Sequence, residues 1–272
     1  SNEPLQPINR VSTGLAGLDE VLDGLRIGDN VVWRVSDLDD YRRLVLPFID
    51  AAADAGRQII YLRFGAHAPI VSDHPGVRVI HINALGGFES FTSRIWHLIE
   101  EHGRGAFYVC DCLSELLNAW ATDAMVGNFF RVVCPFLFEL DTVAWFALHP
   151  ERHSRMTLDR IRETTQVMID VHRDGPEIQI HPIKAWGRQS PTMFLPHREQ
   201  DGRFEPITDS SDATRVQANL ELEYLHRQPL LDYWDKLFQE AGRALANNEE
   251  HCMADLQDQV LRVLISRDPK IL

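Results

Sequence analysis

Short apolar runs alternate with amphipathic stretches along the first 150 residues or so of the chain. Runs of strand length occur at residues 30–35, 58–64, 77–82, 106–113 and 141–148. Apolar positions at helical spacing occupy the intervals 39–55, 87–103 and 115–140. Strands that alternate with helices predict an α/β fold, with a mainly parallel sheet and helices on both of its faces.

The pattern changes twice towards the end of the chain. Residues 165–173, 177–186 and 191–199 read as three late strands, and Asp174-Gly175 is a favourable turn between the first two, so antiparallel pairs are expected there. From residue 211 onwards three charge-mixed helical segments follow without a strand. We therefore expect a domain over residues 1–210 and a helical appendage over residues 211–272 that leads into a following domain.

Capping residues refine two of the predicted helices. Asp37 and Asp39 are both candidate N-caps for the helix over 39–55, and Gly56 is a typical stop. Ser114 is a candidate cap for the helix over 115–140, which is expected to break near Pro135.

Net charge and composition disfavour several classes of function. The net charge of -13 disfavours a general nucleic-acid binder, which normally presents a basic face. No apolar run approaches the ~20 residues that span a bilayer, so no membrane partner is expected. The cysteines lie mostly in apolar stretches and read as free buried thiols, which favours a cytoplasmic location.

The segment VSTGLAGLDEVLDGLRIGDNVVW, residues 11–33, resembles the start of RecA-like ATPases of the KaiC type. In that family an ST-G-x-x-G-L-D-x-x-L-x-G-G stretch leads into the first strand and then the P-loop. Asp111, at the end of an apolar strand, matches the Walker B aspartate, and Lys184 falls in a late strand that carries a lysine in the family. The resemblance covers roughly residues 10–200 and implies a RecA-like P-loop NTPase three-layer sandwich.

The loop after the first strand departs from this family. Against G-x-x-x-x-G-K-[ST], residues 36–43 read SDLDDYRR, so Ser36 and Tyr41 replace the glycines. Arg42 replaces the lysine that bridges the phosphates, and Arg43 replaces the magnesium-binding hydroxyl. Asp37, Asp39 and Asp40 would place negative charge where a triphosphate would bind.

The family's paired glutamates after the second strand are also missing, because Gly65, Ala66 and His67 follow that strand. The sequence therefore predicts a degenerate nucleotide site in a pseudo-ATPase, with no catalytic residue and no cofactor. Its remnants would be Ser36, Asp37, Asp40, Arg42, Arg43 and Asp111.

A second resemblance lies in residues 103–142, 160–166 and 190–198. They look like the N-terminal region of multidomain proteins related to phosphoenolpyruvate synthase and pyruvate phosphate dikinase. There a KaiC-like module precedes the PEP/pyruvate-binding domain, which would be the partner of this chain in the same polypeptide. The resemblance implies that the catalytic residues of such an enzyme lie beyond residue 272.

Several other residues have two interpretations. Lys184 and Arg188, with His181, form a cationic patch for an anion or a subunit interface in a homo-oligomer, or an ordinary charged surface. His149 and His153 have a metal-like spacing, but the intervening Pro150 favours a solvated loop, and no metal site is expected. Arginines 152, 155, 160 and 162 would pair with surplus carboxylates, or hold an anion.

Three functions remain open from the sequence. The first is a non-catalytic assembly or regulatory module of a larger PEP-synthase-like protein. The second is an unorthodox ATPase that uses Arg42 or Arg43 for phosphate and Asp111 for Mg²⁺. The third is a sensor of a small anionic metabolite in the former nucleotide crevice.

Overall fold

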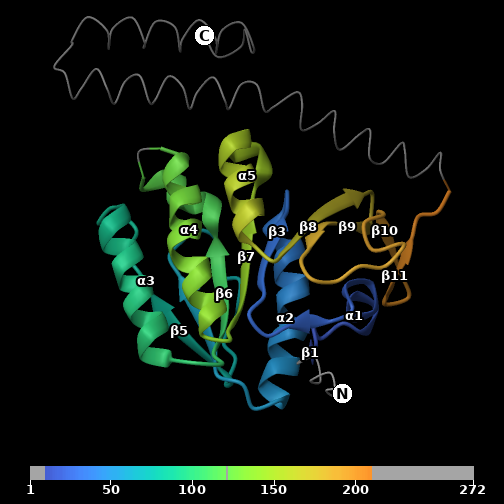
Figure 1. The fold of residues 1–272 in the computed structure, drawn as a ribbon, viewed down its shortest axis with the longest axis horizontal. Coiled ribbons are helices and arrows are strands. Elements are labelled where there is room, and N and C mark those ends of the chain that lie inside the picture. The colour runs from blue at the N-terminus through green and yellow to red at the C-terminus, as the bar shows by residue number, and fades with distance from the viewer. Residues whose placement is uncertain (1–9, 121, 210–272) are drawn as a thin grey trace, which may run out of the picture.

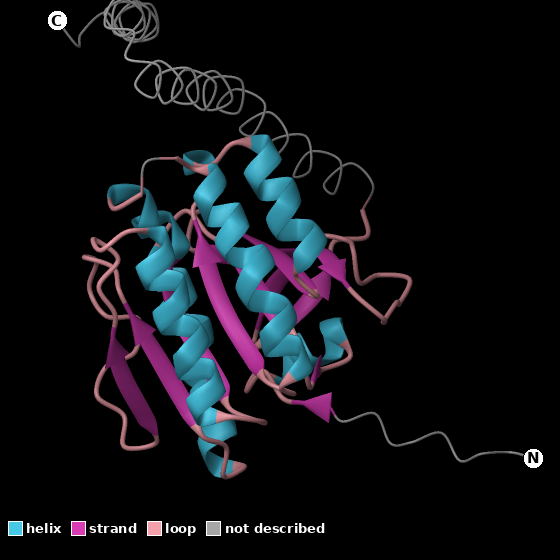
Figure 2. Cartoon of the chain, turned by 60° about the vertical axis from the view of Figure 1, so that its left-hand side comes forward, coloured by secondary structure: helices cyan, strands magenta, loops and turns pink. Residues whose placement is uncertain are grey.

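The computed structural model describes residues 10–120 and 122–209, which form a nine-stranded mixed sheet with helices on both faces (Figures 1 and 2). The strand order is β11-β10-β9-β8-β3-β7-β6-β4-β5. The six parallel strands are β3 (Asn30–Arg34), β4 (Ile59–Arg63), β5 (Val77–His81), β6 (Phe107–Cys112), β7 (Val143–Leu148) and β8 (Val167–Asp174). The antiparallel extension consists of β9 (Glu177–Ala185), β10 (His197–Gln200) and β11 (Arg203–Pro206).

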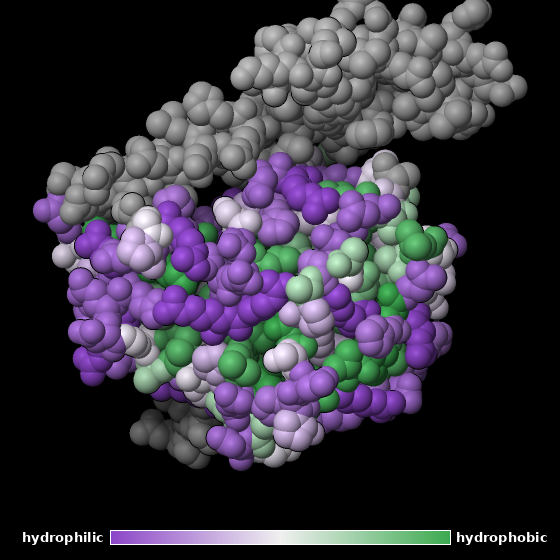
Figure 3. Space-filling model, turned by 180° about the vertical axis from the view of Figure 1, so that it is seen from behind, coloured by the Kyte–Doolittle hydropathy of each residue, from purple (hydrophilic) through white to green (hydrophobic). Residues whose placement is uncertain are grey.

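Two hydrophobic cores separate the layers. Helices α1 (Ala16–Leu22) and α2 (Leu38–Asp54) pack on one face of the sheet. Helices α3 (Phe88–His102), α4 (Ala124–Glu139) and α5 (Arg155–Thr164) pack on the other. Strands β3, β6 and β7 are buried on both faces, which accounts for their nearly continuous apolar sequences. Seen from behind, hydrophobic surface residues lie interspersed with hydrophilic ones (Figure 3).

The N-terminal segment is fixed to the core by the residues that carry the KaiC-like motif. β1 (Arg10–Val11) pairs with β2 (Leu25–Arg26), and the backbone N–H of Thr13 donates to Asp19 Oδ1 over 2.7 Å. A Cβ added to Gly14, at φ +83°, would lie 2.0 Å from the carbonyl oxygen of Pro47 in α2. A Cβ on Gly17 would lie 2.7 Å from the Cα of Arg203 in β11. These glycines therefore permit close backbone packing.

Most predicted elements are confirmed, with two corrections. The helix predicted over 115–140 with Ser114 as its cap is not one helix: a 3₁₀ helix, η1 (Leu113–Asn118), is followed by the separate helix α4. The break lies before residue 124 and not at Pro135, which is exposed within α4, so the carbonyl that it leaves without a helical N–H can face water. The strand expected over 191–199 begins only at His197, because residues 191–195 form turns between two prolines, and β11 was not predicted.

The tryptophans divide between core and surface. Trp33, Trp120 and Trp145 are buried, whereas Trp96 is partly exposed and Trp186 is 59% exposed. Cys110, Cys112 and Cys134 are buried free thiols, as predicted. Within the described ranges, the helices are too short or too polar to cross a bilayer. The predicted appendage over 211–272 lies outside the described residues.

Candidate functional site

The carboxyl end of β3 leads into α2 through only three residues. β3 ends at Arg34, and α2 begins at Leu38 with Asp37 as its N-cap. The Asp37 side chain accepts a hydrogen bond from the backbone N–H of Asp39 over 2.9 Å. Asp37, rather than Asp39, is therefore the cap, and an aspartate satisfies part of the helix terminus that would otherwise bind an anion.

This connection does not have the shape of a phosphate-binding loop. Positions 38–41, which align with the loop of the P-loop motif, already belong to α2. Every residue from 29 to 55 is described, and none of them has a positive φ. The backbone therefore turns directly into the helix and does not wrap around a ligand.

The side chains that replace the P-loop lysine and hydroxyl point elsewhere. Arg42 donates to the carbonyl oxygens of Ala68 and Pro69 over 2.6 and 2.9 Å, and also contacts Asp39. Arg43 Nη2 lies 2.9 Å from Glu199 Oε1 on β10. Both guanidinium groups therefore hold neighbouring segments of the chain, while Ser36 is exposed.

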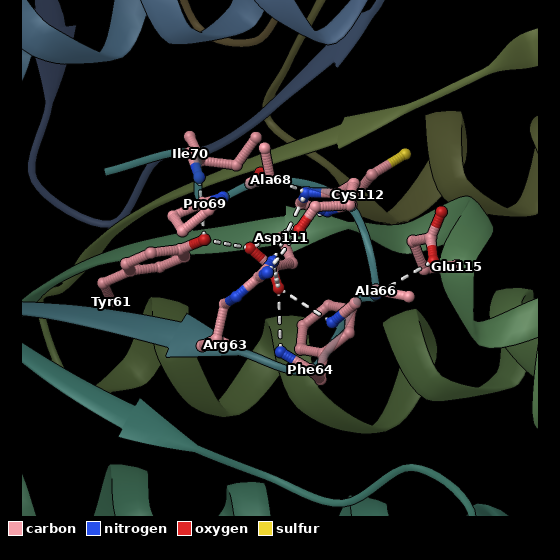
Figure 4. A network of polar contacts seen from close by, with 12 residues as sticks. Tyr61, Arg63, Phe64, Ala66, Ala68, Pro69, Ile70, Asp111, Cys112 and Glu115 are labelled. Atoms are coloured by element: carbon pink, nitrogen blue, oxygen red, sulfur yellow. Dashed lines mark hydrogen bonds and ion pairs between the residues drawn. The ribbon is translucent and has the colours of Figure 1, made fainter. Parts of the chain in front are cut away.

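Asp111, near the end of β6, is fully buried and surrounded by donors from β4 and the residues after it (Figure 4). Its Oδ2 accepts from Arg63 Nη1 over 2.9 Å and from the backbone N–H groups of Phe64 and Gly65 over 2.8 Å each. Its Oδ1 accepts from the hydroxyl of Tyr61. Burial and this hydrogen bond raise the pKa of Tyr61, so the phenol remains a donor. Both carboxylate oxygens are thus occupied, which does not fit a role as a magnesium ligand.

The segment after β4, where KaiC-type ATPases carry paired glutamates, contacts the end of β6 and the start of η1. Ala66 N–H donates to Glu115 Oε2 over 3.1 Å. His67 Nε2 accepts from the N–H of Cys112 over 3.2 Å, and its Nδ1 lies 2.7 Å from the carbonyl oxygen of Ala68. These contacts tie His67 to its own segment and to the end of β6, so the side chain serves to fix the segment.

His149 follows β7 and contacts the residue after β3, at the point where the connections of the two strands leave towards opposite faces of the sheet. Such a switch point is the usual ligand position in an open α/β sheet. Here His149 Nδ1 donates to the carbonyl oxygen of Val35 over 2.8 Å. A hydrogen bond with Cys112 raises the pKa of His149 to about 9, although burial opposes the shift.

A Ser-His-Asp arrangement lies beside this histidine. Ser114 Oγ is 2.6 Å from His153 Nε2 and accepts from the N–H of His149 over 2.9 Å, and His153 Nδ1 is 2.5 Å from Asp123 Oδ1. Burial alone would raise the pKa of Asp123, but the hydrogen bond and charge of His153 lower it. Ser114 and His153 are both fully buried, so no substrate reaches the hydroxyl. The arrangement instead joins three segments of the chain.

His153 is fully buried and His149 is half-buried, which differs from the solvated loop expected for both. The contact of Asp123 with His153, and of His153 with Ser114, could not be predicted, because local sequence patterns do not show which distant segments come into contact. Ser114 was singled out by the sequence as a helix cap, and His149 and His153 as part of a solvated loop, but not as members of one group.

The late cations lie apart from these residues. Arg188 is buried and forms two bonds to Asp29, over 2.8 and 2.9 Å. Lys184 Nζ donates to the carbonyl oxygens of Arg162 and Glu163 at the end of α5. His181 lies near the carbonyl oxygen of Phe194. The cationic patch predicted from the sequence is thus divided among separate structural contacts.

The arginine cluster does not gather around one point either. Arg152 contacts Asn118, Arg160 contacts Asn128, and Arg155 lies 3.9 Å from Asp159. Among residues 10–120 and 122–209, no group of three or more His, Cys, Asp or Glu side chains is placed to hold a metal ion.

Comparison with known proteins does not assign the chain to a family. No protein-family model matches the sequence, and no curated protein matches it.

Proposed function

We propose that this chain is a non-catalytic RecA/KaiC-like module, with an assembly or regulatory role in a larger protein. The observation that carries the proposal is the occupation of Asp111 by four donors from its own chain. A magnesium-binding carboxylate needs a free oxygen facing the nucleotide. Here metal binding would have to break contacts with Arg63 and with two backbone N–H groups.

The start of α2 supports the same conclusion. Asp37 caps the helix, and Asp40 is held by Arg173 from β8, so the helix terminus is already compensated by its own carboxylates. Arg42 is held by the backbone of residues 68 and 69. A triphosphate would therefore meet carboxylates, without a cation free to bridge its charges.

The proposed fold family and parent protein rest on the two sequence resemblances. A mainly parallel sheet between two helical layers, with antiparallel strands at the end, agrees with the fold that the KaiC-like motif implies. The second resemblance favours a parent protein related to phosphoenolpyruvate synthase or pyruvate phosphate dikinase. In that arrangement the catalytic partner is a PEP/pyruvate-binding domain in the same polypeptide.

Isothermal titration calorimetry of the 272-residue chain with ATP and Mg²⁺ tests the proposal directly. We expect no binding heat and no phosphate release. Titration into Asp111→Asn provides the control, because a magnesium ligand at this position would make any binding depend on the carboxylate. Micromolar binding to the natural chain that is lost in Asp111→Asn would overturn the proposal and favour the unorthodox ATPase.

A further inference from the structure

Helix α4 carries an exposed apolar row on the outside of the molecule. Figures 1 and 2 show α4 in the helical layer between α3 and α5. Val132 and Phe138 are 43% and 39% exposed, and Pro135 between them is also exposed. Residues at this spacing of three lie on one side of a helix. The row is therefore a continuous apolar strip on the solvent side of α4.

Aromatic pairs extend this strip on both sides. Trp96 of α3 stacks on Phe136 with ring centroids 4.0 Å apart and an interplanar angle of 9°. Trp186, after β9, meets Phe138 edge-on with a centroid distance of 6.0 Å. Exposed clusters of Trp and Phe are typical of the central residues of protein interfaces. They also hold the strip in a fixed shape before any partner binds.

The charges beside the row are arranged symmetrically about Pro135. Arg131 and Glu139 lie four residues before and after it, and both are exposed. In the described part of the chain, neither side chain has a recorded hydrogen bond or ion pair. Val132 and Phe138 lie three residues before and after Pro135. The order of exposed residues on α4 is thus similar in both directions from Pro135, with opposite charges at the two ends of the row.

We infer that α4 is the contact surface for a second copy of this chain, in a dimer with a two-fold axis passing near Pro135. A two-fold axis places the same surface on both partners. When that axis is perpendicular to α4, the two helices run in opposite directions. At the commonest helix crossing angle, about -50°, rows of residues spaced by four lie alongside each other. The row Arg131–Pro135–Glu139 then meets its own copy reversed, so each Arg131 faces Glu139 of the other copy.

This pairing explains why a second copy is favoured over other occupants. A partner of unrelated sequence would have no reason to match a surface that is complementary to itself. The inference gives the proposed assembly role a partner, but it does not depend on the absence of ATP binding. A monomeric chain would therefore leave the proposal of no ATP binding unaffected, and ATP binding would leave the dimer unaffected.

Charge reversal tests the pairing. We expect the 272-residue chain to show twice the 31.1 kDa mass of one chain in light scattering or sedimentation equilibrium. Arg131→Glu alone and Glu139→Arg alone should each weaken dimerisation at least about tenfold, because each change puts like charges opposite each other twice. The double variant Arg131→Glu/Glu139→Arg should restore the dimer. A monomer at every concentration, or single variants that dimerise normally, would overturn the inference.

A cysteine at the axis gives an independent measurement. In a Cys252→Ser background, Pro135→Cys should form an intermolecular disulfide under mild oxidation, because residues near a two-fold axis face their own copies. Asn128→Cys, exposed two turns earlier on α4, is the matched control and should crosslink much less. Equal crosslinking at both positions, or none at position 135 in a chain that dimerises, would place the interface elsewhere, for example on residues 211–272 or a following domain.

Discussion

Arg173 on β8 holds the carboxylate of Asp40 in the first turn of α2, with its Nε 2.9 and 3.2 Å from the two carboxylate oxygens. Asp40 is 3% exposed, so this pair closes one side of the helix terminus at which a nucleotide phosphate would have been bound. Arg173 on β8, the strand next to β3, thus neutralises the Asp40 carboxylate.

Removing this carboxylate should destabilise the protein more than removing its exposed neighbour. We expect Asp40→Ala to lower the free energy of unfolding by about 1.5–3 kcal/mol, as for a hydrogen bond to a charged group. Asp39→Ala, which loses an exposed pair with Arg42, should cost about 0.2–1 kcal/mol. Urea denaturation of both variants measures the difference, and equal losses would show that the Arg173 pair adds nothing.

The N-cap provides a second stability test. Asp37→Ala removes the acceptor of the Asp39 N–H and should cost about 0.5–2 kcal/mol. Ser36→Ala, one residue earlier and exposed, is the control and should change stability by less than about 0.5 kcal/mol. Thermal unfolding of the two variants measures this difference in stability. An Asp37→Ala variant as stable as the natural chain would mean that water replaces the cap without a loss of stability.

Asp111 should be a structural residue. Asp111→Ala leaves the Arg63 guanidinium and two backbone N–H groups without their acceptor, and we expect a loss of about 3–5 kcal/mol. Tyr61→Phe removes one hydroxyl and should cost about 1 kcal/mol, or more if Asp111 and Ile70 are left unsatisfied. A mild effect of Asp111→Ala on denaturant midpoints would contradict this assignment and reopen a binding role for the carboxylate.

Stability should also depend on pH through His149. Its pKa is raised from 6.5 to about 9, chiefly by the hydrogen bond with Cys112, with help from the carbonyl of Val35. Because the folded state holds this proton more tightly than the unfolded chain, the contribution is complete below pH 6.5 and is lost as the pH rises through about 9.

The free energy of unfolding should therefore fall between these two pH values. His149→Gln should flatten that part of the profile, whereas His81→Gln, at an exposed position, should leave it unchanged. Denaturant titrations at intervals across the range make the comparison. A profile with the same slope in His149→Gln would assign the pH dependence to other groups.

The sequence predicted the alternating elements and the absence of a phosphate-binding loop, since both depend on local spacing and residue type. It also matched Ser12, Thr13, Gly14, Gly17 and Asp19 to a known pattern. The structure shows what these residues do: they pack and hydrogen-bond the N-terminal segment to α2 and β11. The residues that match the KaiC-type pattern are thus ones that support the sheet, whereas positions 36–43 differ from the P-loop pattern.

What the sequence did not predict depends on contacts between distant segments. The partners of Asp111 come from β4 and the residues after it, and those of Ser114, His149 and His153, lie 35 and 39 residues further along the chain. The break in the helix after η1 was also missed, because Pro135 was the stronger local signal. In the structure Asp123, at the start of α4, binds His153 and the N–H of Ser154.

The three-residue connection between β3 and α2 limits how a phosphate site could be introduced into this protein. Placing a glycine, a lysine and a threonine at positions 36, 42 and 43 would change the side chains but leave the backbone path unchanged, because positions 38–41 would still be helical. Formation of a phosphate-binding loop would require unwinding the first turn of α2, together with release of Asp40 and Arg42 from their partners. Substitutions that release Asp40 or Arg42 lose these contacts before any phosphate site forms, so single changes are not expected to create nucleotide binding at this connection.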